Sequence, residues 1–339
     1  MKTAIINGKI ITPHRILDQA SLVMEDGVIA GIVRGRKPEA DCCIDAEGAY
    51  VSPGFIDIHT HGGGGHDFMD GTPDAIIKAC MAHLAHGTTS ICPTTLTCRD
   101  DYKKLLDASD DIIRMSAAPE LEGAMELADE LKARGILASI GHSDATYDHV
   151  IEAWERGYTH VTHLYSGMST IRRINAYRHL GVIESAYLID GMTVEIIADG
   201  KHLPPELLRF IVKMKPIEDI CLVTDSMRGA GMDDGEHVLL GSLAHGQECI
   251  IDDGVAVLPD RSAFAGSVCT ADRCVRTMYH QAEVRLEDAV RMMTYNPAKI
   301  LGIQDRKGSL SAGMDADVVI FDDDIRVQSV LVKGKKVVG

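Results

Sequence analysis

Short β-branched runs alternate with helical segments through the middle of this 339-residue chain, and this alternation constrains the fold more than any other feature. It predicts parallel strands joined by helices. The expected strands are 55–60, 89–97, 112–119, 136–142, 159–165, 193–198 and 219–225. The clearest expected helices are Thr72–His86, Leu121–Arg134, Ala145–Arg156 and Pro204–Lys213. Because polar residues collect just past the strand ends, the pattern favours a (β/α)8 barrel, in which catalytic residues lie at that edge.

Both ends of the chain are typical of short strands and turns instead. Asn7-Gly8 and Asp26-Gly27 are hairpin signals near the N-terminus. Residues 316–321 and 330–338 are again β-rich. We therefore expect one small β domain built from residues 1–52 and 306–339, and a catalytic barrel domain at 53–305.

Charge and composition argue against several classes of partner. The formal net charge of −16 argues against nucleic acids and anionic membranes, but it leaves a small anionic substrate open. The chain shows no run of about 18 apolar residues and no signal-peptide pattern. Its nine cysteines are scattered, which predicts reduced thiols in a cytoplasmic protein.

His59-Thr60-His61 closes the first expected barrel strand and opens onto a run of four glycines. In a strand, residues i and i+2 point to the same face, so the two imidazoles should project side by side. Neutral imidazole nitrogens are good ligands for zinc and related cations. The motif suggests a metal-dependent enzyme, although two surface histidines near a turn would give the same pattern.

Three later strand ends carry His142, His163 and Asp225. Taken singly, each histidine suits a hydrogen-bonded structural role and the aspartate suits a helix cap. Taken together, they favour a divalent ion, which lowers the pKa of bound water towards about 7. A nearby carboxylate can take the water proton and return it to a leaving amine. The expected reaction is hydrolysis of an amide or a related bond.

Other residues could recognise an anion. Arg172, Arg173 and Arg178 share one loop and would suit phosphate or carboxylate, although a solvated charged loop is the simpler interpretation. His202 could contact substrate or only solvent. The segment 264–267 precedes a helical stretch and could present backbone donors to an anion.

The combined motifs resemble the N-acetylglucosamine-6-phosphate deacetylase family of the amidohydrolase superfamily. They are PGFIDIHTHGGGG (53–65), GTTSICPTTLT (87–97), APELEGA (118–124), IGHSDATYD (140–148), VTHLYSGM (161–168), IIADGKHLP (196–204), LVTDSM (222–227), FAGS (264–267), YNPAKILG (295–302) and KGSLSAGMDADVVIFD (307–322). The resemblance covers nearly the whole chain. It implies a distorted (β/α)8 TIM-like barrel with a small β-sandwich made by both termini, and hydrolysis of the acetamide of N-acetylglucosamine 6-phosphate to glucosamine 6-phosphate and acetate.

The resemblance also implies roles for individual residues. It makes His142 and His163 ligands of the main metal, His59 and His61 ligands of an optional second metal, and Asp225 the general base and acid at the metal. The positions implied to bind substrate are Ser166, Gly167, Arg178, His202, Phe264, Ala265 and Gly266. At 166–167 the family usually has Asn-Ala. One or two divalent ions are expected, zinc first, while iron, manganese and cobalt suit the same ligands. The implied assembly is a homodimer.

One family motif is missing from this chain. The family has a third barrel strand that ends in His-Leu-Glu-Gly-Pro, and its Glu is a principal metal ligand. Here Cys98–Tyr102 leads straight to the next helix, so only seven strands are expected. Glu120 and Glu122 belong to a different family segment and are not substitutes.

Two explanations of the missing strand are open: residues omitted from the chain with the numbering closed up, or a genuine deletion. The first is favoured, because losing a βα unit should cost more than the roughly 5–15 kcal/mol of a domain's stability. The spacing of Cα atoms across residues 97–102, about 3.8 Å for each trans peptide, is the test.

Two other functions remain alternatives. The first is another amidohydrolase that acts on a cyclic amide or a deaminable base, against which the arginine loop and His202 argue. The second is a degenerate, non-catalytic homologue that binds amino-sugar phosphates, for which the absent Glu motif is the support.

Overall fold

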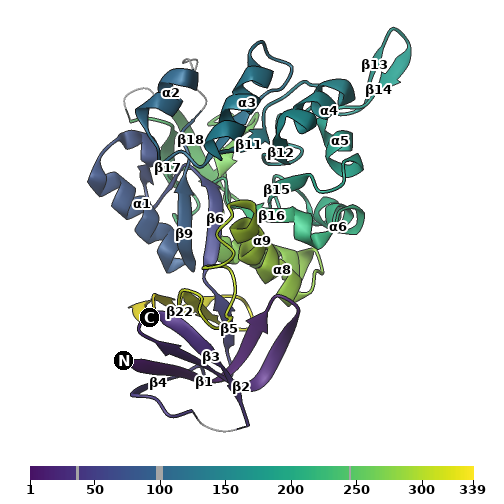
Figure 1. Ribbon diagram of the computed structural model, residues 1–339. Coiled ribbons are helices and arrows are strands. Elements are labelled where there is room, and N and C mark those ends of the chain that lie inside the picture. The colour runs from purple at the N-terminus through teal and green to yellow at the C-terminus, as the bar shows by residue number, and fades with distance from the viewer. Residues whose placement is uncertain (36–37, 97–101, 244–245) are drawn as a thin grey trace. The chain divides into compact units, whose positions relative to one another are not determined.

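The computed structural model covers residues 1–339 and describes all of them except 36–37, 97–101 and 244–245 (Figure 1). The chain divides into two compact units. The first contains Met1–Leu96, Ile197–Phe210 and Leu222–Gly339, and the second contains Thr97–Ile196 and Ile211–Cys221. None of the helices in the described part of the chain is long and apolar enough to cross a membrane.

Strands from both termini form one sheet in the first unit, as the sequence predicts. Its strands are β1 (Lys2–Thr12), β2 (Arg15–Glu25), β3 (Val28–Arg34), β4 (Cys42–Asp45), β5 (Tyr50–Pro53), β21 (Val318–Phe321), β22 (Val327–Val332) and β23 (Lys335–Val338). The order is β23-β22-β21-β5-β1-β2-β3, and β4 pairs with β1. Ile29 of β3 and Leu331 of β22 share one apolar core although their strands lie near opposite ends of this order. The sheet must therefore fold over on itself.

Only one of the two predicted turns forms. At Asp26-Gly27 the chain turns between β2 and β3, where Glu25 pairs with Val28. The turn predicted at Asn7-Gly8 is wrong, since both residues lie inside β1 at an irregularity in its pairing with β2. A Cβ on Gly8 would stand 2.5 Å from Cγ2 of Val51. The glycine thus serves the close approach of β5 rather than a turn.

Two of the predicted barrel strands lie in the first unit. They are β6 (Phe55–Thr60) and β9 (Thr88–Pro93), which pair in parallel. Between them come β7 (Gly62–Gly63), β8 (His66–Asp67), the 3-10 helix η1 (Phe68–Asp70) and α1 (Pro73–Ala85). Helix α1 begins after Thr72, whose side chain accepts a hydrogen bond from the Ala75 N–H. This βα arrangement is the one that the sequence predicts.

The rest of the first unit includes a small antiparallel sheet that the sequence analysis missed. Its strands are β17 (His237–Leu240), β18 (Gln247–Asp252), β19 (Val255–Val257) and β20 (Phe264–Ser267). The helical elements that follow are α7 (Ala271–Arg276), η3 (Thr277–Gln281), α8 (Leu286–Met293) and α9 (Tyr295–Ile300). Met227 and Val268 belong to the apolar cluster of this sheet.

The second unit is built on a sheet with the order β10-β11-β12-β15-β16. These strands are β10 (Arg114–Ala117), β11 (Leu137–Ile140), β12 (Tyr158–Val161), β15 (Thr193–Ile197) and β16 (Ile220–Val223). The last residues of β15 and β16 already belong to the first unit. The other elements are α2 (Tyr102–Ala108), α3 (Ala124–Arg134), α4 (Tyr147–Arg156), β13 (Arg172–Ile174), β14 (Tyr177–His179), α5 (Val182–Leu188), α6 (Pro205–Met214) and η2 (Ile217–Asp219). Helix α6 continues across the boundary between the units.

All seven predicted barrel strands are therefore present, and the described part of the chain has no further strand between β9 and β10. Most of the segment in which the Cα spacing was to be tested, residues 97–101, lies outside the described residues. The expected omission of residues therefore stays a prediction.

Candidate metal centre

His59, His61 and Asp225 converge in the first unit. His59 lies at the end of β6, His61 just past it, and Asp225 two residues past β16. Oδ1 of Asp225 lies 3.3 Å from Nε2 of His59 and 3.2 Å from Nε2 of His61. The three potential ligand atoms are all within 4.8 Å of one another. Two imidazoles and a carboxylate around one point are a donor set that suits a divalent transition metal.

The tautomer of His61 also suits metal binding. Its Nδ1 lies 3.0 Å from the carbonyl oxygen of Thr94, and a carbonyl can only accept, so Nδ1 carries the hydrogen. The other nitrogen, Nε2, faces Asp225. Burial lowers the pKa of His61, but the hydrogen bond and charge of Asp225 raise it more, so the pKa lies above its ordinary value. A cation would compete with this proton for Nε2.

Backbone contacts hold Asp225 beside β6. Its N–H donates to the carbonyl oxygen of His59 at 2.9 Å, and its φ is +46°, a region that few non-glycine residues adopt. Below it, the buried carboxylate of Asp57 accepts a hydrogen bond from Oγ1 of Thr224 at 2.5 Å. Burial raises the pKa of Asp57, while the nearby His83 and this hydrogen bond lower it. These contacts set the register between the two ligand-bearing segments.

The second unit brings His142 and His163 together. Their Nε2 atoms are 3.1 Å apart, and their rings meet at an interplanar angle of 67°. Two imidazole nitrogens at this separation can share either a proton or a cation. Both residues have positive φ, +47° for His142 and +26° for His163. Such conformations are uncommon outside glycine and collect at functional sites.

A buried ionic cluster beside His163 was missed by the sequence analysis. Glu195 on β15 is fully buried, and its Oε2 accepts a hydrogen bond from the His163 N–H at 3.2 Å. Its Oε1 lies 2.8 Å from Nη2 of Arg114 and 3.1 Å from Nε2 of His160. The charged Glu195 inside the apolar strand β15 was the signal that could have found the cluster. Glu195 thus holds the backbone of an expected metal ligand.

Glu120 is occupied by protein donors. Its carboxylate accepts hydrogen bonds from Oγ of Ser143 at 2.7 Å and from the N–H of Asp144 at 2.6 Å. It therefore ties down the loop after β11, directly past His142. This structural role agrees with the expectation that Glu120 does not replace the missing family Glu.

His202 pairs with a carboxylate in the first unit. Its Nδ1 lies 2.7 Å from Oδ2 of Asp199, and its ring centroid lies 5.2 Å from that of Phe264. Burial lowers the pKa of His202, but the hydrogen bond and charge of Asp199 raise it more, so the net shift is upwards. A partly buried imidazolium of this kind can bind a phosphate group.

The segment Phe264–Ser267 belongs to the small antiparallel sheet. It is strand β20, paired with β19 through Ala256 and Gly266, and helix α7 follows it as expected. Pairing with β19 engages part of its backbone, and its predicted role in binding an anion stays a prediction. The ring of Phe264 is exposed, so this residue and the nearby Gly266 remain able to contact a substrate.

The arginine loop is the hairpin β13–β14, which projects from the helices of its unit (Figure 1). Arg172 pairs with Asp144 at 2.5 Å and so supports the loop after β11. Arg178 is exposed and stands opposite Arg173 in the hairpin. Like charges directly opposite are unfavourable in a hairpin, and a bound anion would relieve them.

Ser166 and Gly167 form the turn after β12. The Ser166 N–H donates to the His163 carbonyl oxygen at 2.9 Å. Gly167 has φ +60°, and a Cβ there would stand 3.1 Å from Cδ2 of His142. This turn therefore packs against the His142 and His163 pair, and glycine is needed for both its backbone and its close approach.

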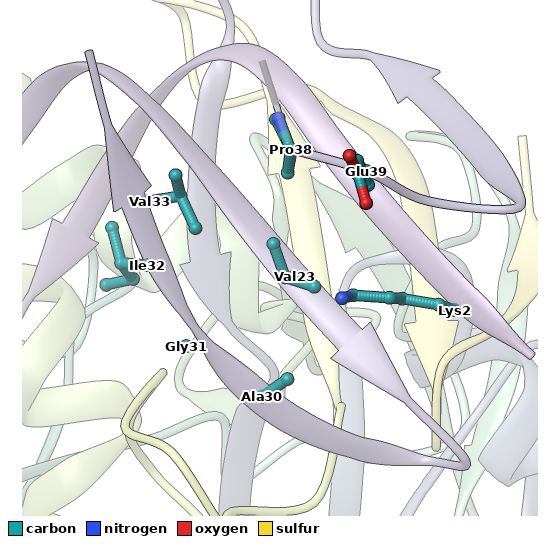
Figure 2. A pocket seen from close by; sticks show the side chains of 8 residues that line it. All are labelled: Lys2, Val23, Ala30, Gly31, Ile32, Val33, Pro38 and Glu39. Atoms are coloured by element: carbon teal, nitrogen blue, oxygen red, sulfur yellow. The ribbon is translucent and has the colours of Figure 1, made fainter. Parts of the chain in front are cut away.

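A cavity of about 520 Å³ lies apart from these residues, on the sheet made by the two termini (Figure 2). It is lined by Lys2, Val23, Ala30, Gly31, Ile32, Val33, Pro38 and Glu39. None of the predicted site residues lines it, so it has no part in the chemistry considered below.

Parallel strands that end in histidines and a carboxylate are typical of metal-dependent hydrolases built on a (β/α) barrel. The model of the amidohydrolase family matches residues 50–119 and 114–337, and the chain belongs to this family. The two matched segments meet at 114–119, close to the position of the missing third strand.

Similar proteins carry more specific names. A relative from Lysinibacillus sphaericus, an N-acetylglucosamine-6-phosphate deacetylase, is 28% identical over 94% of this chain and 93% of its own length. An N-acetylgalactosamine-6-phosphate deacetylase from Escherichia coli O157:H7 is 28% identical over 96% and 97%. The first alignment extends over 371 positions, more than the 339 residues of this chain, so that relative has residues without a counterpart here.

A solved structure is also similar. It is an N-acetyl-D-glucosamine-6-phosphate deacetylase mutant from Mycobacterium smegmatis in complex with N-acetyl-D-glucosamine-6-phosphate. It matches with a TM-score of 0.89 and 28% identity over 100% of this chain and 99% of that chain. The likeness confirms the predicted fold class, a TIM-like barrel with a small β-sandwich.

Proposed function

We propose that this protein is a metal-dependent hydrolase that removes acetate from N-acetylglucosamine 6-phosphate. The observation that carries the proposal is the convergence of His59, His61 and Asp225 at strand ends, in a chain similar to such deacetylases over nearly its full length. The products are glucosamine 6-phosphate and acetate, which assigns the enzyme to amino-sugar catabolism.

The metal ligands that we propose are His59, His61 and Asp225 in one unit and His142 with His163 in the other. Within each set the candidate ligand atoms lie close to one another. The hydrogen bond made by Nδ1 of His61 leaves its Nε2 for the metal. When bound, a divalent ion polarises the amide carbonyl and lowers the pKa of the attacking water. Zinc is proposed first, and iron, manganese or cobalt suit the same donors.

Asp225 is proposed as the general base and acid. Its side chain is 18% exposed, so water and substrate can reach a carboxylate that is otherwise fixed by its backbone. It takes a proton from water and returns it to the nitrogen of the leaving amine. The exposed position distinguishes it from Asp57, which is fully buried.

We propose that cationic side chains recognise the sugar phosphate. Asp199 raises the pKa of His202, and Arg173 and Arg178 lie opposite each other on one hairpin. Ser166 and Gly167 are proposed to meet substrate through the backbone, and Phe264, Ala265 and Gly266 to line it. A phosphate is the substrate group that these residues favour over a neutral cyclic amide.

The proposal places the enzyme in the cytoplasm as a homodimer. Every cysteine that the structure describes is a free thiol, as expected in a reducing compartment. The domain division also remains a proposal, with 1–52 and 306–339 as the small β domain and 53–305 as the catalytic domain. Size measurement of the purified protein tests the dimer.

The deciding experiment is acetate release by metal-loaded protein from three substrates. N-acetylglucosamine 6-phosphate should be hydrolysed, and N-acetylglucosamine without phosphate should be much poorer. N-acetylgalactosamine 6-phosphate is the third substrate, because one relative carries that name. Equal turnover with and without phosphate would favour the alternative amidohydrolase. Stoichiometric metal without any turnover would favour a non-catalytic binding protein.

A further inference from the structure

Arg228 is a buried arginine, three residues past Asp225, that the proposed chemistry does not use. Its side chain is only 3% exposed, and the side chain of its partner Asp70 is 6% exposed. The guanidinium Nη2 lies 3.0 Å from Oδ1 of Asp70, and Nη1 lies 3.3 Å from Oδ2. This two-point geometry uses the planar fork of arginine, which lysine cannot reproduce.

The same guanidinium also reaches three carbonyl oxygens. It donates to Gly65 at 3.3 Å from Nη1, to Leu239 at 2.7 Å from Nε, and to Gly241 from Nη2. Gly65 lies in the glycine loop directly after His61, and the other two carbonyls lie in and just past β17. One side chain therefore joins the loop that follows the first ligands to the strand region that follows Asp225.

The backbones of these two segments are paired along their length. The N–H groups of His61 and Gly62 donate to the Ser226 carbonyl oxygen at 2.8 and 3.0 Å. Farther along, the Gly65 N–H donates to the Arg228 carbonyl oxygen at 2.8 Å. Together with the bond from Asp225 to His59, these contacts run from the triad to Arg228 without an intervening element.

Asp70 fixes the far end of the loop that begins after His61. Its Oδ2 accepts a hydrogen bond from the Asp67 N–H at 3.0 Å, and the Phe68 N–H donates to the His61 carbonyl oxygen at 2.9 Å. Burial raises the pKa of Asp70, but the bonds from Arg228 and the Asp67 N–H, together with the charge of Arg228, lower it more, so the pKa lies below its ordinary value. The loop between His61 and Asp70 is thus tied at both ends.

We propose that Arg228 is a positioning residue for the metal triad. It holds the loop 62–70 against the segment 225–230, and so keeps the imidazoles of β6 and the carboxylate of Asp225 at one point. The inference rests on the proposed function only in that the triad binds a metal. Without the fork of Arg228 the two segments can separate, and the three ligand atoms lose their preorganised spacing.

The test is Co²⁺ binding to the full chain, followed by visible absorption and by competition with a chelator. Arg228→Met should weaken the binding step assigned to the triad by about 10- to 100-fold, as is typical for residues that support metal ligands. Arg228→Lys should restore part of the affinity, and Asp70→Asn should weaken it while disturbing the core less. The Co²⁺ absorption bands should change in shape in all three variants.

Arg276→Lys is the matched control. Arg276 also pairs with an aspartate, Asp272 at 3.0 Å, and donates to the Asp324 and Ile325 carbonyl oxygens, but it touches neither ligand-bearing segment. It should lower thermal stability without changing Co²⁺ affinity. Unchanged affinity in Arg228→Met and Asp70→Asn, or an equal loss in Arg276→Lys, would overturn the inference.

A failure of the proposed metal site has a different signature. His61→Ala should abolish the binding step assigned to the triad. If His61→Ala leaves every Co²⁺ binding step unchanged, the triad is not a metal site and the proposed function is at fault. If His61→Ala removes a step that the Arg228 variants leave intact, only the positioning role is wrong.

Discussion

Asp225→Asn is the most informative substitution at the triad, because it removes one charge and keeps the shape of the side chain. Asp225 has φ +46°, a conformation that asparagine tolerates and alanine does not. Asparagine therefore avoids the strain of roughly 1–2 kcal/mol that a left-handed conformation costs other residues. The bond from its N–H to the His59 carbonyl oxygen is also retained.

The expected loss of rate follows from the role of the carboxylate. A positioned general base or acid contributes about 10²- to 10⁴-fold, and each factor of ten corresponds to about 1.36 kcal/mol of barrier. The barrier should therefore rise by roughly 3–5 kcal/mol. The free energy of unfolding should change by only about 1 kcal/mol, because asparagine keeps the shape of the side chain and the backbone bond to His59.

In the absence of metal, the variant should also differ from the parent protein in how its stability depends on pH. Asp225 raises the pKa of His61, so in the parent protein this interaction stabilises the fold fully below about pH 6.5, the unfolded pKa, and is lost as pH rises through the folded value. Asp225→Asn should remove that stabilisation. The stability difference between the two proteins should be largest below pH 6.5 and should vanish at high pH.

Three measurements test this reasoning. Acetate release from N-acetylglucosamine 6-phosphate should fall at least a hundredfold at saturating substrate, which is the lower end of the range for general acid–base catalysis. Metal analysis should still find bound ion, held by the remaining histidines. NMR titration of the metal-free protein should show a lower pKa for His61. Unchanged turnover in Asp225→Asn would refute the role of this carboxylate as base.

Three further substitutions test the surroundings. Asp199→Asn removes the partner that raises the pKa of His202, so KM for the phosphorylated substrate should rise about tenfold at pH 7.5 and much less at pH 5.5, where His202 is protonated in either protein. Glu120→Gln should cost about 1–2 kcal/mol in urea unfolding and leave metal content unchanged. Glu195→Gln leaves Arg114 buried without its counter-charge, so it should cost about 3–5 kcal/mol in the same assay.

Each of these expectations has a contrary outcome. An equal change in KM at both pH values would show that Asp199 does not act through the charge of His202. Loss of metal from Glu120→Gln would make that residue a ligand, against its observed hydrogen bonds. A neutral effect of Glu195→Gln would mean that the buried pair with Arg114 contributes nothing to stability.

Much of the fold could be predicted because its signals are local. All seven strands of the barrel region follow from apolar runs bounded by polar residues, and the β-rich ends form one sheet. Turn signals were less reliable. Asp26-Gly27 forms a hairpin, whereas Asn7-Gly8 lies within β1, because the space beside Val51 admits only a glycine there. A dipeptide cannot report a contact made by a distant strand.

Interactions between residues far apart in the chain could not be predicted from the sequence. Glu195 lies inside β15 and Arg114 begins β10, yet nothing local shows that they pair with each other. The antiparallel strands from β17 to β20 were likewise unforeseen, and with them the strand form of the 264–267 segment. Arg228 follows a recognised motif, but its link to Asp70 exists only where two segments meet.

The sequence by itself determined which chemistry was available, since strand periodicity alone places His59 and His61 on one face. It also showed that the family's His-Leu-Glu-Gly-Pro motif, with its Glu, does not occur in this sequence. Only the tertiary structure decided that Asp225 lies within hydrogen-bonding distance of both imidazoles, and that His142 meets His163. The reason is physical: periodicity orients neighbours along one strand, whereas backbone bonds between distant segments decide which side chains share a point.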